Sequence, residues 1–343
     1  MNRKLGKPLF LAFVAVSFLA GCRPAQTVET GAAIEPVEAI HLVEVQVPKL
    51  KTTRVTPAAV DGDGGYVVEG TAGGDTYRAE VRARDARVVR ISRNGASYYK
   101  WPGIVVVGHR GTVKFAPENT VAAFKKAIEL GADLIEIDVR ETKDGHLVIL
   151  HDASVDRTTN GSGPVAEMTL NQVKALDAGS WFAPEFAGEK IPTLEEALET
   201  MKGKALPDLD FKAGEPEKLI ATVRKFGLLG KVTLYCGSWP LMHRTIELSR
   251  DFLIRPTVPF RGAGFGKLLD EFDPPIVNMD WKEFSEPLVR RVHIHGTKAF
   301  VNTMGPNDTE LAMIQAIEAG ADYMQSDHLD VLVPLLRSRG LHR

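Results

Sequence analysis

Residues 103–139 read GIVVVGHRGTVKFAPENTVAAFKKAIELGADLIEIDV, and this stretch decides the predicted fold. It opens with a short β-branched run, continues with apolar residues at helical spacing over 119–131, and closes with a second β-branched run over 133–139. A strand, a helix and a strand in this order are typical of a parallel sheet covered by helices. The first strand ends on His109 and Arg110, two polar side chains that a hydrophobic core does not require.

The same alternation of strand and helix continues to the end of the chain. Further strand candidates are HLVILHD (146–152), LPDLDF (206–211), KVTLYC (231–236), FLIRPT (252–257), PIVNMD (275–280), KAFVNT (298–303) and DYMQSD (322–327). These candidates exceed the eight strands of a (β/α)8 barrel by one, and we expect PIVNMD to be irregular. The sequence therefore predicts an α/β fold, a TIM barrel over residues 101–343. A doubly wound open sheet is the alternative, disfavoured because no Gly-rich phosphate loop follows the first strand.

The residues before the barrel fall into segments of different composition. Residues 52–100 contain short runs of alternating polarity separated by Gly, Asp and Asn, which predicts a small β-rich domain. Residues 22–51 are rich in Pro, Thr, Ala and Val and are predicted to be a tether. Residues 1–21 place basic side chains before the uncharged run LFLAFVAVSFL, as in a secretory signal peptide. That run is shorter than the roughly 20 apolar residues of a membrane-spanning helix.

The sequence LAGC at 19–22 resembles the bacterial lipobox, in which the Cys becomes the lipidated first residue of the mature chain. We therefore expect lipidation of Cys22 and attachment to a membrane surface through its acyl chains. The expected location is the bacterial cell envelope, at the outer membrane or periplasm in a Gram-negative species. Cys236 is the second cysteine of the chain and is left without a partner, so no disulfide is expected.

Composition excludes one class of function. The chain has 343 residues, 44% hydrophobic and 25% charged, with a formal net charge of -2. These values are typical of a globular protein, and no long basic stripe compensates for the lack of positive charge. We therefore expect no nucleic-acid partner.

Ionisable side chains gather at the ends of the first four predicted strands, and in a barrel such ends share one mouth. Residues two apart on a strand point to the same side, so Glu136 pairs with Asp138, and Asp210 with Lys212. Neighbouring carboxylates in an apolar mouth need a compensating cation. The complete set is His109 and Arg110, Glu136 and Asp138, His151 and Asp152, and Asp210 and Lys212.

The chemistry of this set indicates metal-assisted cleavage of a phosphate ester. Glu136, Asp138 and Asp210 offer hard oxygen ligands that suit Mg²⁺ or Ca²⁺ better than zinc. Arg110 and Lys212 suit the oxygens of a phosphate. The two histidines remain available as proton donor and acceptor.

The motifs that carry these residues resemble those of the glycerophosphodiester phosphodiesterases over residues 103–336. They are GHRG and PENT (108–120), GADLIEIDVRETKDGHLVILHDASVDRTTNGSGPV (131–165), MTLNQVKALDAG (168–179), GEKIPTLEEAL (188–198) and GADYMQSDHLD (320–330). The resemblance implies a TIM-barrel hydrolase with a small cap insertion over 152–191. Such an enzyme cleaves a glycerophosphodiester to sn-glycerol 3-phosphate and an alcohol.

Carried over by position, the resemblance assigns a role to each motif residue. It implies His109 and His151 as the general acid and base pair, and Arg110 and Lys212 as phosphate-binding groups. It implies Glu136, Asp138 and Asp210 as ligands of a divalent ion, Ca²⁺ or Mg²⁺. The family usually has Glu where this chain has Asp210, one methylene shorter, which puts the identity and affinity of the ion in question.

Two other functions remain open from the sequence. One is a phospholipase C or D type reaction on intact membrane lipids, which membrane attachment favours. The other is a non-catalytic envelope protein that binds glycerol phosphates, for which the change at Asp210 and the extra β-rich domain are slight support.

Overall fold

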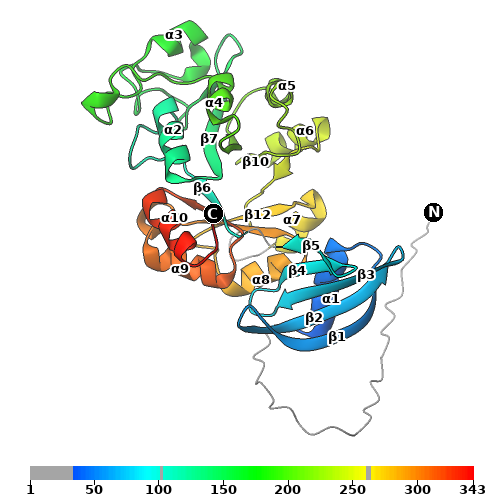
Figure 1. Ribbon diagram of the computed structural model, residues 1–343. Coiled ribbons are helices and arrows are strands. Elements are labelled where there is room, and N and C mark those ends of the chain that lie inside the picture. Colours follow the sequence, from blue (N-terminus) through cyan, green and yellow to red (C-terminus); the bar gives the residue numbers. More distant parts are fainter. Residues whose placement is uncertain (1–33, 101–102, 260–263) are drawn as a thin grey trace, which may run out of the picture. The chain divides into compact units, whose positions relative to one another are not determined.

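The computed structural model describes residues 34–343 apart from 101–102 and 260–263, with residues 98–100 described by their backbone alone. From residue 103 onward the chain alternates strands and helices around a barrel (Figure 1). The barrel strands are β6 (Val105–Gly108), β7 (Leu134–Glu141), β9 (Leu206–Phe211), β10 (Thr233–Tyr235), β11 (Leu253–Ile254), β12 (Ile276–Asp280), β13 (Lys298–Asn302) and β14 (Tyr323–Ser326).

These eight strands are parallel and follow the order β11-β10-β9-β7-β6-β14-β13-β12. Backbone hydrogen bonds between β12 and the segment that directly follows β11 join the two ends of the sheet. Val258 N–H donates to the Asn278 carbonyl at 2.9 Å, and Asn278 N–H donates to the Pro256 carbonyl at 3.0 Å. The predicted TIM barrel is therefore confirmed, and its carboxyl-terminal strand ends meet at one mouth.

Helices cover the barrel because each presents an apolar stripe to the sheet. In α2, for example, the buried side chains are Ala123, Phe124 and Ala127, at helical spacing. Thr120 caps the start of α2 by accepting from Ala123 N–H, and Gly131 ends it with φ 95°, a conformation that suits glycine. The covering helices are α2 (Val121–Leu130), α4 (Leu194–Met201), α5 (Pro216–Lys225), α6 (Trp239–Leu248), α7 (Phe265–Phe272), α8 (Glu286–Ile294), α9 (Glu310–Ala319) and α10 (Leu329–Ser338).

The surplus strand is not the one the sequence predicted. PIVNMD forms the regular strand β12, which pairs with β13 in unbroken register. The extra strand is β8 (Leu147–Ile149), which pairs antiparallel with β7 and lies outside the barrel order. An Asp-Gly turn joins β7 to β8, with Gly145 at φ 85° and its N–H bonded to the Thr142 carbonyl. Such a tight turn makes a hairpin, so β8 cannot be a parallel neighbour of β7.

The segment after β8 confirms the predicted cap insertion. It contains the short helices η1 (Val165–Glu167), α3 (Leu170–Ala175) and η2 (Pro184–Phe186). These pack on an apolar cluster of their own, which also includes side chains from β8. Its buried members are Val148, Leu150, Val155, Val165, Val173, Ala178 and Ile191.

The β-rich segment before the barrel is a separate small domain. It is an antiparallel sheet in the order β1-β2-β3-β4-β5 with helix α1 packed on it (Figure 1). Its elements are α1 (Pro36–Gln46), β1 (Lys51–Val60), β2 (Asp63–Ala72), β3 (Asp75–Arg82), β4 (Arg87–Arg93) and β5 (Ala96–Lys100).

Helix α1 corrects the predicted tether over residues 22–51. Ala39, Leu42 and Val43 recur at helical spacing and are buried in the core of the small domain, which makes the second half of that segment structural. The remainder of the tether, the predicted signal peptide and Cys22 lie outside the described residues. Among the residues that the structure describes, no helix has the length and apolar character needed to span a membrane.

The small domain and the barrel belong to one compact unit, Ala32–Arg343, and buried charges join them. Arg87 pairs with Asp85 in its own domain and with Asp322 of the barrel at 3.2 Å. His293 lies 2.7 Å from Asp322 through Nε2 and 2.5 Å from the Asp85 carbonyl through Nδ1. Buried ion pairs and hydrogen bonds therefore connect the small domain to the barrel.

Candidate active site

The turn after β6 places His109 and Arg110 at the barrel mouth. A Cβ on Gly108 would lie 2.4 Å from the Gly111 carbonyl, so this approach requires glycine at position 108. Arg110 adopts φ 50°, a left-handed conformation that non-glycine residues seldom take. Its N–H donates to Glu136 Oε2 at 2.8 Å, which ties the turn to the neighbouring strand.

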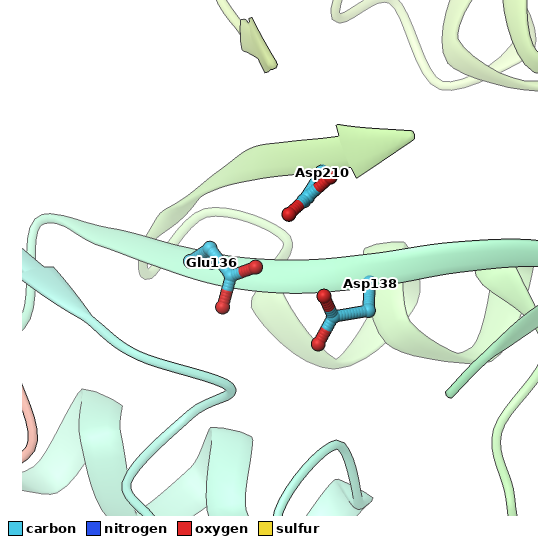
Figure 2. Close-up of side chains that lie close together, drawn as sticks. All are labelled: Glu136, Asp138 and Asp210. Atoms are coloured by element: carbon cyan, nitrogen blue, oxygen red, sulfur yellow. The ribbon is translucent and has the colours of Figure 1, made fainter. Parts of the chain in front are cut away.

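Three carboxylates converge in the mouth. Glu136 and Asp138 lie two residues apart on β7, and Asp210 lies on β9 directly opposite Asp138 in the strand register. Figure 2 shows the three side chains pointing toward one another from these two strands. One oxygen of each lies within 4.8 Å of the others, and all three residues are buried. The predicted carboxylate set is therefore brought together.

Burial makes this cluster electrostatically costly. Burial, and then the charges of Asp138 and Asp210, raise the pKa of Glu136 well above its ordinary value. Burial also raises the pKa of Asp210, with a further contribution from Asp138. Burial acts in the same direction on Asp138, but Lys212, Arg110 and a hydrogen bond from Asn119 leave the pKa of that carboxyl below its ordinary value.

The donor set fits a divalent cation. Asp210 Oδ1 is a buried acceptor without a hydrogen-bond partner among the described residues. Such an atom is unfavourable unless a cation or donor reaches it. Three carboxylates with oxygens this close are the hard ligands that Ca²⁺ and Mg²⁺ prefer. The site can therefore hold a metal ion.

Two cations flank the carboxylates. Lys212 Nζ lies 3.1 Å from Asp138 Oδ1 and also pairs with Asp210 Oδ2. Arg110 Nε lies 3.6 Å from Asp138 Oδ2, and its Nη1 donates to Glu118 Oε1 at 2.9 Å. Both predicted phosphate-binding side chains therefore lie at the edge of the predicted metal site.

The Nδ1 atom of each histidine lies within hydrogen-bonding distance of a carboxylate. His109 Nδ1 lies 2.6 Å from Asp327 Oδ1, and its Nε2 accepts a hydrogen bond from Arg110 Nε at 3.1 Å. His151 Nδ1 lies 2.7 Å from Asp152 Oδ1. His151 is close enough for its charge to lower the pKa of Asp138. Both histidines therefore belong to the same mouth as the carboxylates.

Comparison with known proteins shows the family to which the chain belongs. The model of the glycerophosphoryl diester phosphodiesterase family matches residues 109–224, which include all these side chains except Asp327. A glycerophosphodiester phosphodiesterase of Caldanaerobacter subterraneus subsp. tengcongensis is 36% identical over 252 residues, covering 69% of this chain and 99% of that protein. The chain belongs to the glycerophosphodiester phosphodiesterase family. It is therefore an enzyme, a phosphoric diester hydrolase.

Solved structures of the family agree with the fold. A glycerophosphodiester phosphodiesterase from Agrobacterium tumefaciens superposes with a TM-score of 0.63 at 31% identity, covering 67% of this chain and 99% of that one. A phosphodiesterase from Oleispira antarctica, in complex with the product sn-glycerol-3-phosphate, gives 0.60 at 25% identity, covering 68% and 97%. Both similarities leave about a third of this chain unmatched.

The structure adds Asp327 to the residues that the sequence predicts for the site. Its contact with His109 joins positions far apart in the chain. The available signal is its position directly after β14, because acids at the carboxyl ends of barrel strands are candidates for the site. Asn119 adopts φ 57° and donates to Asp138 Oδ2 at 2.7 Å, so PENT supports the carboxylates directly.

One predicted detail of the site changes. His151 follows β8, the hairpin strand, and so does not close a barrel strand as predicted.

Proposed function

We propose that this enzyme hydrolyses glycerophosphodiesters to sn-glycerol 3-phosphate and an alcohol with a divalent metal ion, Ca²⁺ or Mg²⁺. One observation carries the proposal: three buried carboxylates, two cations and two carboxylate-backed histidines share the barrel mouth. The Oleispira antarctica relative, which binds sn-glycerol-3-phosphate, supports the substrate class.

The carboxylates and the cations of the site have different roles in the proposed reaction. Glu136, Asp138 and Asp210 hold the ion, which polarises a phosphoryl oxygen when bound. Arg110 and Lys212 bind the other phosphate oxygens and stabilise the charge that develops in the transition state.

The histidines move the protons. A glycerol hydroxyl attacks phosphorus as one histidine removes its proton, and the other protonates the departing alcohol oxygen. Water then opens the cyclic phosphate to give glycerol 3-phosphate. In the arrangement described, His109 Nδ1 faces a carboxylate and Nε2 accepts a hydrogen bond, which suits His109 to the role of base.

Product release tests the proposal directly. The chain without residues 1–22 is supplied with deacylated glycerophosphodiesters, and glycerol 3-phosphate is measured with and without chelator. We expect activity that the chelator abolishes and that Ca²⁺ or Mg²⁺ restores. His109→Ala and His151→Ala should each lower kcat by about 10²- to 10⁴-fold while the circular dichroism spectrum is retained. Activity that survives both substitutions would contradict the proposed proton transfers.

The same assay separates the alternatives. Intact phospholipid in mixed micelles is offered beside the soluble diesters. Preferential turnover of the intact lipid would indicate a phospholipase. Tight binding of a diester without product would indicate a binding protein.

We propose further that the mature chain is exported and anchored to the bacterial cell envelope through acyl chains on Cys22. The support is the lipobox-like sequence at 19–22. Cys22→Ser should abolish labelling by radioactive palmitate and release the protein from the membrane fraction. An unchanged membrane fraction would contradict the anchor.

A further inference from the structure

Arg157 of the cap insertion binds two carboxylates, Glu118 and Asp152. Its Nη1 and Nη2 donate to the two oxygens of Glu118 at 2.8 and 2.7 Å. Its Nε donates to Asp152 Oδ2 at 2.7 Å, and Nη2 lies 3.3 Å from Asp152 Oδ1. One guanidinium therefore holds two carboxylates in a planar fork, a geometry that lysine cannot reproduce.

Each of these carboxylates supports a residue of the proposed mechanism. Asp152 bonds to Nδ1 of His151, and Glu118 accepts from Nη1 of Arg110. A continuous set of contacts thus runs from His151 through Asp152, Arg157 and Glu118 to Arg110. Because Arg110 also bonds to His109, the contacts extend to the second histidine.

The charges of this network depend on the guanidinium. The hydrogen bond from Arg157 is the largest cause of the lowered pKa of Asp152. Burial raises the pKa of Glu118, and the hydrogen bond and charge of Arg157 together with Arg110 reverse that effect. Without Arg157, the Asp152 and Glu118 carboxylates would lose their shared cation, and each would be free to reorient.

We infer that Arg157 is a positioning residue that couples the orientation of His151 to that of Arg110. This inference rests on the proposed function, because it assigns His151 to proton transfer and Arg110 to phosphate binding. Through this one side chain, the cap would align a proton-transfer group with a phosphate-binding group.

The first test is Arg157→Gln in the chain without residues 1–22, assayed with a glycerophosphodiester and saturating metal. We expect kcat to fall by about 10- to 100-fold, a range typical of second-layer partners. We also expect KM to rise, since Arg110 loses the support of Glu118.

A matched control separates this role from the general loss of a surface ion pair. Arg244 on α6 also binds two carboxylates, Glu215 and Glu217, and its side chain is 51% exposed against 44% for Arg157. Arg244→Gln should leave kcat, KM and the pH profile unchanged. Equal effects of the two substitutions would overturn the inference.

A double-mutant cycle tests the coupling. Asp152→Asn and Glu118→Gln are each measured alone and combined with Arg157→Gln. If the side chains act through one network, each double variant should lose less activity than the product of its single losses. Independent, multiplicative losses would overturn the inference.

If Arg157→Gln does not fold, Arg157→Lys is the variant that tests the inference. It preserves the charge but not the fork, so we expect a normal melting temperature with a lowered kcat. Wild-type kcat and KM in Arg157→Lys would overturn the inference. A failure of the proposed function looks different: the wild-type chain itself would release no glycerol 3-phosphate, and the inference would fall with it.

Discussion

Glu136 lies at the inner end of the carboxylate cluster, with 3% of its surface exposed and two further acids beside it. Its Oε2 accepts the Arg110 N–H, but that single hydrogen bond does not offset its burial, and the pKa of Glu136 remains raised. The residue is therefore poorly suited to a metal-free mouth and well suited to a metal ligand. Burial of Glu136 beside two further acids therefore lowers the stability of the folded chain when no cation is bound.

The raised pKa of Glu136 predicts how stability depends on pH. A carboxyl whose pKa is higher in the folded chain than its ordinary 4.5 stabilises the fold fully below that pH, and the contribution is lost as pH rises. Metal-stripped Glu136→Gln should therefore gain stability relative to wild type as pH rises above 4.5, by at most about 1.4 kcal/mol per pH unit. Urea unfolding of both proteins at successive pH values measures the difference.

Metal addition provides the control for this comparison. Saturating Ca²⁺ or Mg²⁺ should stabilise wild type by about 2.7 kcal/mol at 100 times the dissociation constant, and Glu136→Gln by much less. A stability difference that does not change with pH would contradict the electrostatic account of Glu136.

The β7–β8 hairpin is the element that departs most from a regular barrel. It adds an antiparallel strand at the point where a barrel strand ends, and the cap continues directly from it. His151 is thus carried by the hairpin and the cap, whereas the three acids are carried by barrel strands. Helix α4 follows the cap and packs against β8, so its stability supports this part of the mouth.

The capping box at the start of α4 is expected to stabilise this helix. Thr193 Oγ1 accepts from Glu196 N–H at 3.2 Å, and Glu196 Oε2 accepts from Thr193 N–H at 2.8 Å. Thr193→Ala should lower the free energy of unfolding by about 1 kcal/mol, because a helix N–H loses its partner. Thr193→Ser keeps the hydroxyl and should retain most of the stability. Equal losses in the two variants, measured by urea unfolding, would contradict the capping role.

Buried charges give the whole molecule a specific connection between the small domain and the barrel. Asp322 lies against Arg87 of the small domain and His293 of α8. Burial raises the pKa of Asp322, but Arg87 and His293 outweigh it and hold the pKa well below its ordinary value. Such a network stabilises the connection only while its charges remain paired.

Arg87→Leu is expected to destabilise the whole chain. It leaves Asp322 buried without its guanidinium partner, and a broken buried pair costs about 3–5 kcal/mol. Arg78→Leu is the matched control, since Arg78 pairs with Glu80 at 2.7 Å and its side chain is 49% exposed. The exposed pair should contribute about 1 kcal/mol or less. Thermal or urea unfolding measures the loss of stability in each variant. Similar losses of unfolding free energy in Arg87→Leu and Arg78→Leu would contradict the greater contribution expected of the buried pair.

The barrel and the identity of its carboxylates follow from local patterns in the sequence. Strand periodicity is local, so Glu136 and Asp138 had to face the same side, and parallel strands brought Asp210 to the same end. The Asp-Gly sequence at 144–145, before β8, is likewise a local signal, typical of a hairpin turn.

Long-range packing selects the side chains that complete the site. His109 meets Asp327 across 218 positions and Arg157 meets Glu118 across 39, separations that no local pattern encodes. Likewise, composition alone predicts a tether over residues 22–51. Part of that segment forms helix α1, because its apolar side chains pack against the small sheet. Local preferences specify strands and helices, whereas long-range pairing depends on how all of them pack together.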